Sequence, residues 1–281
     1  MQIKQEKLIN NIYRVVDEVN ILIDFTNKRI KIVDFSNISM NTLYQIIKIA
    51  IENNIEKIIC NCEEKYTSIF IGLGFIIEGK IKYYFRGKDA ICLSYFVDYE
   101  RSINKYRSKE NLIIKKCLES EKIYRKNEND FIVRRATNQD IDEIISLFSN
   151  VFSTYPSPVY DRDFLEKSMN SNVLYKVAVK DGKILGIASA EINIEHLNAE
   201  ITDCATYPKY RGLGVLSSII DELEKELKDR GILCLYSLSR AINPSINYVF
   251  KKHNYHFGGR LINNCNICGD FEDMNIWVKI I

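Results

Sequence analysis

Two different spacings of hydrophobic residues follow one another near the start of the chain. In VNILIDFTNKRIKIVDF, apolar residues occupy alternate positions on both sides of the polar residues 26–28, which predicts two strands joined by a turn. In MNTLYQIIKIAIENN the spacing changes to that of a helix, with Asn41 as the expected cap and an apolar stripe formed by Leu43, Ile46, Ile47 and Ala50. We therefore expect two strands and then a helix.

A strand, a short helix and further strands complete the first domain. IEKIICNC predicts a buried strand, and EKYTSIFIGLGF predicts a short helix that stops at Gly72 and Gly74. IIEGKIKYYFRGKDAICLSYFVD predicts two or three strands with turns at Gly79 and Gly87. We expect an α/β domain over residues 1–98. A charged, solvated helical connector without glycine or proline follows over residues 99–130.

Residues 131–281 have the pattern of a second α/β domain. Residues 131–135 predict a strand, and Thr137 is placed to cap a helix that TYPSPVY interrupts. A further helix is expected near residues 164–169. LYKVAVKDGKILGIASAEIN predicts a hairpin that turns at Asp181 and Gly182, and AEITDCATYP predicts another strand.

Composition narrows the class of protein without naming a function. The chain has 281 residues, 46% of them apolar, and no uncharged apolar run of about 18 residues, so it predicts a globular protein without a membrane span. Its start carries scattered charges instead of an apolar signal segment, which favours a cytoplasmic location. The 39 basic and 37 acidic residues leave a net charge of +2, which argues against nucleic-acid or membrane partners and for a small-molecule partner.

The eight cysteines do not form a recognisable metal site. Cys60 with Cys62 and Cys265 with Cys268 are closely spaced pairs, but a structural zinc site needs a second pair at matching spacing. In a reducing compartment the thiols are expected to stay free and mostly buried. We therefore predict no metal.

The stretch TYPKYRGLG is the strongest chemical signal in the sequence. It lies between a predicted strand and a helix whose apolar stripe runs from Leu216 to Leu227, so Gly212 and Gly214 lie at the start of that helix. Glycines let a ligand approach the backbone, and the first N–H groups of a helix are unpaired, which suits a phosphate. A Walker loop would need Gly-Lys-Ser/Thr, and a dinucleotide fingerprint would need an acid after ILCLYSLS; the sequence has neither. A purely structural turn is the remaining alternative.

Two motifs resemble those of the GNAT superfamily of acetyl-CoA-dependent N-acetyltransferases. TYPKYRGLGV is similar to its pyrophosphate motif, with Thr206 in place of a valine and Lys209 in place of a Gln/Arg. NPSINYVFKKHNY is similar to its second motif from Asn243 onward, with Phe250 where the family has a tyrosine and Asn254 where it has a glycine. The resemblance implies an α/β (α+β) fold, a mixed and mostly antiparallel sheet flanked by helices, and acetyl-CoA as co-substrate. The implied cofactor-binding residues are Ala205, Thr206, Lys209, Tyr210, Arg211, Gly212, Leu213, Gly214, Asn243 and Phe250.

The second domain resembles more narrowly the β-lysine N-acetyltransferase family, above all in the tail GGRLINNCNICGDFEDMNIWVK. This resemblance implies acetyl transfer to the N6 amine of β-lysine, which gives a neutral zwitterion suited to the role of an osmolyte. It extends more loosely to EEKYTSIFIGLGF. The order of elements in residues 1–98 resembles the second half of an acetyltransferase domain without its phosphate loop. We expect a degenerate half with a structural role or a role in forming a homodimer.

The implied reaction is direct attack by an amine in a ternary complex, and it needs a base. An amine with a pKa of about 10.4 is protonated at neutral pH. Glu200 resembles the base of the histone-modifying branch and is the first candidate; Asp203 is the second. On a regular strand residues 200 and 203 face opposite sides, so only one should reach the site unless a bulge intervenes. The family's tyrosine acid is absent, which leaves Tyr248, water or solvent as proton donor, or a thiolate that leaves unprotonated. A backbone N–H near Ala205 or Thr206 is expected to stabilise the oxyanion.

An acceptor with one carboxylate and two amines needs acids and hydrogen-bonding groups around it. The candidates lie before the phosphate motif and in the tail, and they are Tyr155, Glu191 (also a candidate base), Asn263, Asn264, Glu272, Asp273 and Asn275. Turn residues of a hairpin are the alternative for the tail. Three other functions stay open: acetylation of another small amine (lysine, a polyamine or an amino sugar), acetylation of a protein, and a non-catalytic acetyl-CoA sensor.

Overall fold

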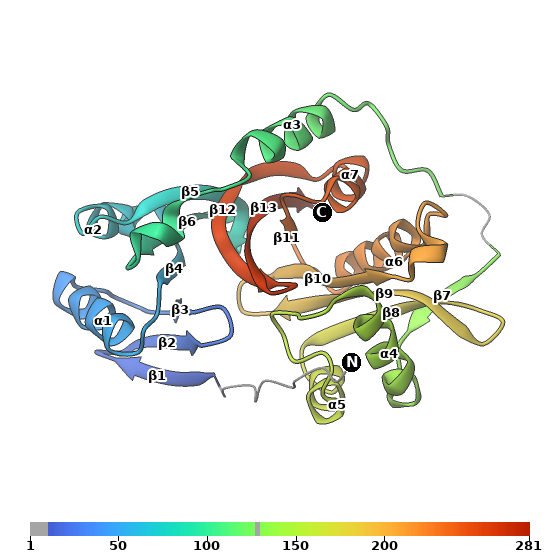
Figure 1. Ribbon diagram of the computed structural model, residues 1–281, viewed down its shortest axis with the longest axis horizontal. Helices are drawn as coiled ribbons and strands as arrows, with labels where there is room; N and C mark the ends of the chain where they lie inside the picture. Colours follow the sequence, from blue (N-terminus) through green and yellow to red (C-terminus); the bar gives the residue numbers. More distant parts are fainter. Residues whose placement is uncertain (1–10, 127–129) are drawn as a thin grey trace.

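The computed structural model describes residues 11–126 and 130–281, and a single twisted sheet runs through both halves (Figure 1). Within these residues 13 strands are ordered β1-β2-β3-β4-β6-β5-β12-β13-β11-β10-β9-β8-β7. No helix in this part of the chain is both long enough and apolar enough to cross a membrane.

Within residues 11–98, the first half of the chain builds six of these strands and two α-helices. Its strands β3 and β4 are parallel and are joined by a crossover through α1, whereas the other pairings within this half are antiparallel. The elements are β1 (Ile12–Val16), β2 (Val19–Asp24), β3 (Arg29–Asp34), α1 (Met40–Glu52), β4 (Lys57–Cys62), α2 (Thr67–Ile71), β5 (Ile76–Phe85) and β6 (Lys88–Phe96).

The second half contains the same series of eight elements, preceded by one strand and two helices. Its parallel pair is β10 and β11, joined by α6. The elements are β7 (Ile132–Arg135), α4 (Ile141–Val151), α5 (Arg162–Met169), β8 (Val173–Lys180), β9 (Lys183–Asn193), β10 (Asn198–Thr206), α6 (Val215–Asp229), β11 (Cys234–Arg240), α7 (Pro244–Lys252), β12 (His256–Ile267) and β13 (Asp270–Ile280). Strands β1 to β6 therefore repeat the order and directions of β8 to β13.

The two halves join edge to edge through β5 and β12. Gly79 and Gly259 are partners in this antiparallel contact. A Cβ added at Gly79 would lie 2.7 Å from the Gly258 carbonyl oxygen, and one at Gly259 would lie 2.4 Å from the Glu78 carbonyl oxygen. Only glycine permits this approach of two backbones. The predicted turn at Gly79 is therefore wrong: Gly79 lies inside β5, and the hairpin turns at residues 86–87.

The expected hairpin of β2 and β3 and the helix near residues 164–169 are confirmed, and one predicted cap is wrong. Ser39 caps α1, because its Oγ accepts a hydrogen bond from the Thr42 N–H at 3.0 Å, whereas Asn41 lies inside the helix. Thr137 forms the expected capping box with Asp140 ahead of α4.

Helices cover the sheet so as to leave a shared inner face. Helices α1 and α2 pack on the first half, and α6 and α7 pack on the second. On the opposite surface, side chains of both halves meet in one core that includes Cys92, Tyr236, Cys265 and Ile267. We call this surface the inner face; α4 and α5 cover its β7–β10 end.

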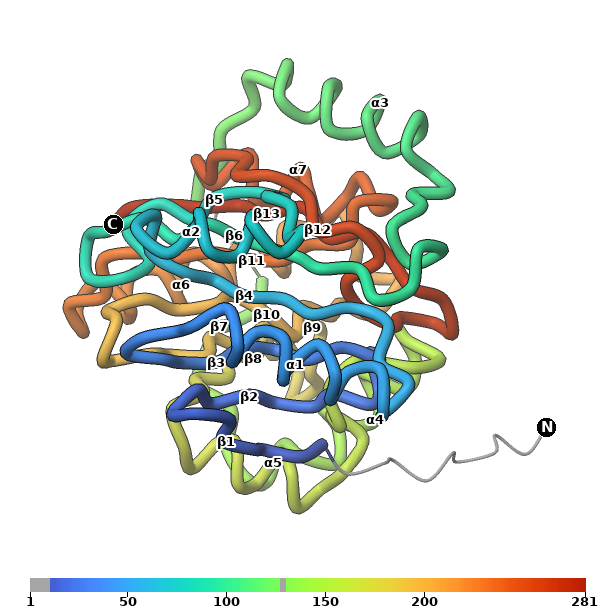
Figure 2. Tube along the Cα trace, turned by 90° about the vertical axis from the view of Figure 1, so that its left-hand side faces the viewer, coloured from blue at the N-terminus to red at the C-terminus, as the bar shows by residue number. Residues whose placement is uncertain are grey.

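The connector contains a short 3-10 helix over residues 99–102 and the α-helix α3 (Arg107–Leu118), which lies over α7 in both views (Figures 1 and 2). Residues 119–126 then run without helix or strand toward the second half. Tyr124 fixes this segment, because its N–H donates to the Lys252 carbonyl oxygen at 2.7 Å and its ring stacks on His253.

Candidate functional site

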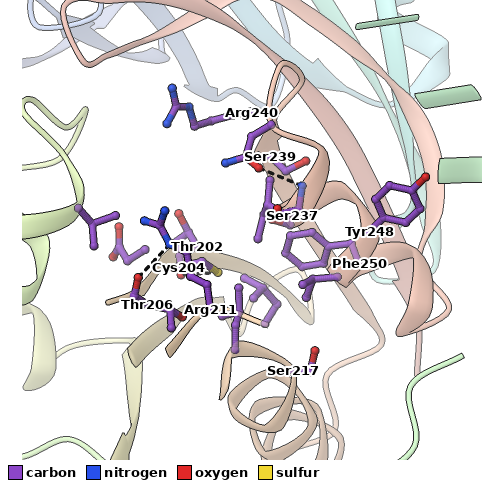
Figure 3. Close-up of a pocket in the computed structure, with 18 of the residues that line it drawn as sticks. Thr202, Cys204, Thr206, Arg211, Ser217, Ser237, Ser239, Arg240, Tyr248 and Phe250 are labelled. Carbon is purple, nitrogen blue, oxygen red and sulfur yellow. Dashed lines mark hydrogen bonds between the residues drawn. The ribbon is translucent and has the colours of Figure 1, made fainter. Parts of the chain in front are cut away.

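A cavity opens where the parallel strands β10 and β11 separate. The two strands pair only over residues 198–200 and 234–236. Beyond these pairs the strands diverge, and a cavity of about 520 Å³ is lined by residues 201–204 and Thr206 of β10, residues 237–240 of β11, and residues from α6 and α7 (Figure 3). An opening between two parallel strands lets a ligand pass from one face of the sheet to the other.

One end of the cavity gathers hydrogen-bond donors of the kind that suit an anion, and we call it the anion site. Gly212 and Gly214 adopt φ of +82° and +81°, and Gly214 is the N-cap residue of α6, so the loop directs unpaired N–H groups at this end. The hydroxyls of Thr206 and Ser217 are buried and have no hydrogen-bond partner among the described residues. Arg211 is exposed, and its Nε donates to the Thr206 carbonyl oxygen at 3.3 Å. These donors fit a ligand that carries phosphate.

The structure places the other predicted residues of this loop around the same end. Tyr210 lines the cavity, and the Lys209 ammonium lies 4.7 Å from the centre of its ring. Ala205 is buried against the α4 side, and Leu213 is 62% exposed, so neither side chain lines the main cavity.

A second cavity, which the sequence did not reveal, adjoins the loop. It measures about 700 Å³ and shares Gly212, Gly214 and Lys252 with the first. Its other wall is residues 121–125 of the connector, which add Lys122 and Arg125. Burial lowers the pKa of Lys252. The connector therefore brings positive charge to the outer end of the anion site.

Helix α7 forms a further wall of the first cavity. Asn243 caps this helix, with its Oδ1 accepting from the Ser245 N–H at 3.0 Å. Phe250 is fully buried, and both Phe250 and Tyr248 line the cavity. The ring of Tyr248 nevertheless points away from Thr202 and Cys204 (Figure 3). Asn247, also fully buried, holds the diverging end of β11, because its Nδ2 donates to the Arg240 carbonyl oxygen at 2.9 Å.

A bulge in β10 places Glu200 and Asp203 on the same face of the sheet. The register with β9 shifts between Thr202 and Ala205, and Asp203 has φ of +48°. Ser189 is opposite Thr202 in β9, and its hydroxyl donates to Asp203 Oδ2 at 2.9 Å. Asp203 therefore lies on the face that Glu200 and Thr202 share, and the expectation of opposite faces on a regular strand does not hold here.

Three carboxylates gather on this inner face. Glu191 is the direct cross-strand partner of Glu200, and Asp203 lies three residues farther along β10. Burial, and then the Glu191 charge, raise the pKa of Glu200 to about 7. Burial, and then the same charge, raise the pKa of Asp203 to about 6. Both groups can therefore take up a proton near neutral pH.

Asp203 is the carboxylate that reaches the cavity. Its side chain lines the opening together with Phe152 and Tyr155, whereas Glu200 lies beyond the lining residues. The Tyr175 hydroxyl donates to Asp203 at 3.5 Å. Burial and the Asp203 charge raise the pKa of Tyr155 well above its usual value. The predicted residue Tyr155 thus lines the cavity beside Asp203.

The predicted acceptor residues of the tail lie at the junction of the two halves instead. Asn263 Nδ2 donates to the Arg101 and Ile103 carbonyl oxygens at 2.9 Å, and its N–H donates to Asp273 Oδ1 at 2.8 Å. Asn264 is fully buried, and Arg29 donates to its carbonyl oxygen at 2.9 Å. The three predicted residues Asn263, Asn264 and Asp273 do not line either of the two cavities described above.

Two further tail residues are also tied to protein groups. Glu272 accepts a hydrogen bond from Arg240 Nε at 2.6 Å and so reaches the cavity only through Arg240, which lines it. Asn275 is fully buried, and its Nδ2 donates to Asn247 Oδ1 at 2.9 Å. The tail motif therefore reflects the packing of β12 and β13. Within the described residues no group of three or more His, Cys, Asp or Glu side chains is arranged to hold a metal ion.

Comparison with known proteins agrees with this geometry. The model of the acetyltransferase (GNAT) domain family matches residues 132–250. The chain is 38% identical over 264 residues to the N-acetyltransferase YodP of Bacillus subtilis, and the match covers 91% of this chain and 94% of that protein. It is 40% identical over 230 residues to a β-lysine N(6)-acetyltransferase of Methanosarcina mazei (74% and 85% covered), and 31% identical over 267 residues to one of Methanococcus maripaludis (94% and 97% covered).

Proposed function

The chain belongs to the GNAT acetyltransferases and is an N-acetyltransferase, and from this premise we propose that it transfers the acetyl group of acetyl-CoA to the N6 amine of β-lysine. Two relatives with this activity in their names support the choice of acceptor. The observation that carries it is that Asp203 lines the opening between β10 and β11, with the Glu200–Glu191 pair on the same inner face. An acceptor with two ammonium groups suits these three carboxylates.

The donor side of the site fits a cofactor with a pyrophosphate and a long, narrow arm. The glycine loop and the unpaired Thr206 and Ser217 hydroxyls would hold the phosphates and the polar groups of the arm. Acetyl-CoA supplies an acyl group that is already activated as a thioester. The opening between the strands leads from this loop on the α6 side to Asp203 on the inner face.

Asp203 acts as the base in this proposal. It removes a proton from the N6 ammonium, and the neutral amine then forms a C–N bond to the carbonyl carbon as both substrates are held together. Backbone N–H groups near Ala205 and Thr206, beyond the bulge, stabilise the oxyanion. The nitrogen of the tetrahedral adduct then gives its extra proton to water, the C–S bond breaks and the thiolate leaves. Because Tyr248 points away from β10, we infer that water protonates this thiolate (Figure 3).

The first experiment measures the release of free CoA with purified protein, acetyl-CoA and L-β-lysine, L-α-lysine or spermidine. We expect the highest kcat/KM for L-β-lysine. Comparable turnover of α-lysine or spermidine would favour an acetyltransferase with a broader range of small amines. The similarity to YodP is compatible with that function as well. Tight acetyl-CoA binding without turnover of any amine would favour a sensor.

Within the same proposal, the product N-acetyl-β-lysine serves as an osmolyte. Acetylation removes one positive charge from β-lysine and leaves a neutral zwitterion near pH 7. Such a molecule can accumulate in the cytoplasm without perturbing charged surfaces, which is the property of an osmolyte. Raising the external salt concentration for cells that carry this gene, and measuring intracellular N-acetyl-β-lysine, tests this role.

A further inference from the structure

The first half of the chain faces the acceptor site with an unpaired cation. In β3, Ile30 and Ile32 pack in the core under α1, so Arg29 and Lys31 lie on the opposite surface, the inner face. Arg29 reaches across this face and donates to the Asn264 carbonyl oxygen in β12 at 2.9 Å. This contact brings β3, and with it Lys31, toward the second half.

The charges on the two sides of this face are complementary. Lys31 and Arg29 both counteract the rise in the pKa of Glu200, which places their charges within electrostatic reach of that carboxylate. Arg29 is committed to Asp24, at 3.0 Å, and to Asn264. Lys31 is partly buried and forms no ion pair with any residue in the described ranges. It is the cation that stays available for a ligand.

The Glu191–Glu200 pair lacks a cation of its own. Like charges directly opposite each other on neighbouring strands destabilise a sheet. Neither carboxylate forms an ion pair with a cation of the described residues, although the chain forms many ion pairs elsewhere. A bound ammonium group would relieve this repulsion. The floor between the pair and the first half is aromatic, with the Tyr84 and Tyr236 rings 5.4 Å apart.

We propose that the first half of the chain completes the acceptor site, with Lys31 binding the acceptor's carboxylate and the Glu191–Glu200 pair binding its second ammonium group. This inference rests on the proposed function, because β-lysine carries both groups at the end opposite to N6. Three residues of strand, roughly 7–10 Å, separate Glu200 from Asp203. An extended diamine can therefore present N6 to Asp203 while its other amine lies at Glu200. Selection of the acceptor is thus shared between the two halves, while the chemistry stays in one.

The test pairs two variants with acceptors that each lack one group. L-β-lysine has both groups, 1,4-diaminopentane lacks the carboxylate, and 6-aminohexanoate lacks the second amine. We expect Lys31→Met to lower kcat/KM at least tenfold for L-β-lysine and for 6-aminohexanoate, but less than twofold for 1,4-diaminopentane. Lys31→Arg should restore most of the loss. Glu191→Gln should lower kcat/KM for the two diamines and leave 6-aminohexanoate nearly unchanged.

The matched control is Lys48→Met, which removes an exposed lysine of α1 and should change none of the three rates. An equal loss on all three acceptors with Lys31→Met, or no loss on any, would overturn the inference while leaving β-lysine acetylation in place. A wild-type protein that acetylates 1,4-diaminopentane better than L-β-lysine, or none of the three acceptors, would overturn the proposed function and the inference together.

Discussion

The two halves of this chain share a topology but differ in what that topology exposes. In each, three antiparallel strands lead through a helix to a parallel strand, and a second helix leads to a hairpin. Residues of the first half have counterparts in the second half with the same structural role, and each residue is the same number of positions away from its counterpart. The Phe70 and Phe75 rings lie 5.0 Å apart, and the Phe250 and Tyr255 rings lie 5.1 Å apart. Equal separation also relates the junction glycines, Gly79 and Gly259.

The halves differ at the parallel pair and at the loop that follows it. Strands β3 and β4 stay paired over residues 29–32 and 57–60, and α1 starts at a serine cap. Strands β10 and β11 separate after residue 200, and α6 starts at a left-handed glycine. The separated strands and the glycine loop, and not the fold as such, therefore make the cavity that we propose as the cofactor site. The first half keeps a closed sheet and contributes its inner face to the other half.

The largest expected effect comes from removing the proposed base, Asp203, which lies in the second half alone. Asp203→Asn should lower kcat by about 10² to 10⁴, because the amide cannot accept the ammonium proton. The affinity for acetyl-CoA, measured by calorimetry, should stay within about twofold. With the pKa of Asp203 raised to about 6, wild-type kcat/KM should fall as the pH drops through 6, and the variant should lose that dependence. An Asp203→Asn protein with near wild-type turnover would instead make Glu200 the base.

The second-largest effect is expected from a substitution that removes a contact between the two halves. Arg29→Met removes the partner of the buried Asp24 carboxylate and the hydrogen bond to Asn264, so it should cost about 3 kcal/mol of unfolding free energy. It should also raise KM for the acceptor more than KM for acetyl-CoA. Urea unfolding and steady-state kinetics measure these changes. The double variant Arg29→Met/Asp24→Asn should recover part of the stability, and a double variant no more stable than Arg29→Met would argue against a pairing penalty.

A smaller effect sharpens the role of the glycine loop. Gly214→Ala places a Cβ at φ of +81°, and Gly182→Ala does the same at +73° in the turn between β8 and β9. Because neither Cβ would meet an atom within 4 Å, each variant should lose about 1 kcal/mol of stability from backbone strain. Only Gly214→Ala should weaken acetyl-CoA binding, by about tenfold or more. Equal affinities in the two variants would leave the loop as a structural turn.

The glycine loop and the cap of α7, which form the donor side in our proposal, could be located from sequence because they are local. Gly212, Gly214 and Asn243 lie in continuous motifs whose backbone geometry follows from a few neighbouring residues. The acceptor side, as we propose it, could not be assembled from sequence in this way. It depends on a bulge at Asp203, a cross-strand pair at Glu191, and Lys31 from a strand far away in the sequence.

The junction was hidden for the same reason. The asparagines of the tail have the composition of a ligand site, but their hydrogen-bond partners come from the first half, which no local pattern could supply. The alternation of strands and helices follows from the spacing of apolar residues in both halves. The placement of Gly79 inside a strand was not, because its requirement for glycine comes from β12, a partner that is distant in sequence.

The smallest expected effect is on the free energy of unfolding, which the charged form of Glu200 on the inner face lowers. Because its pKa is raised from 4.5 to about 7, the folded protein binds a proton there more tightly than the unfolded chain does. The stability from this proton is full below about pH 4.5 and is lost as the pH rises through 7. Glu200→Gln should therefore match the wild type near pH 4.5 and exceed its unfolding free energy by about 1 kcal/mol at pH 8, since partial exposure screens the full effect. Urea unfolding at both pH values measures this difference, with Glu52→Gln on the exposed side of α1 as control. A Glu200→Gln difference that is independent of pH would mean that the carboxylate stays charged, and that Lys31 already serves as its partner in the free protein.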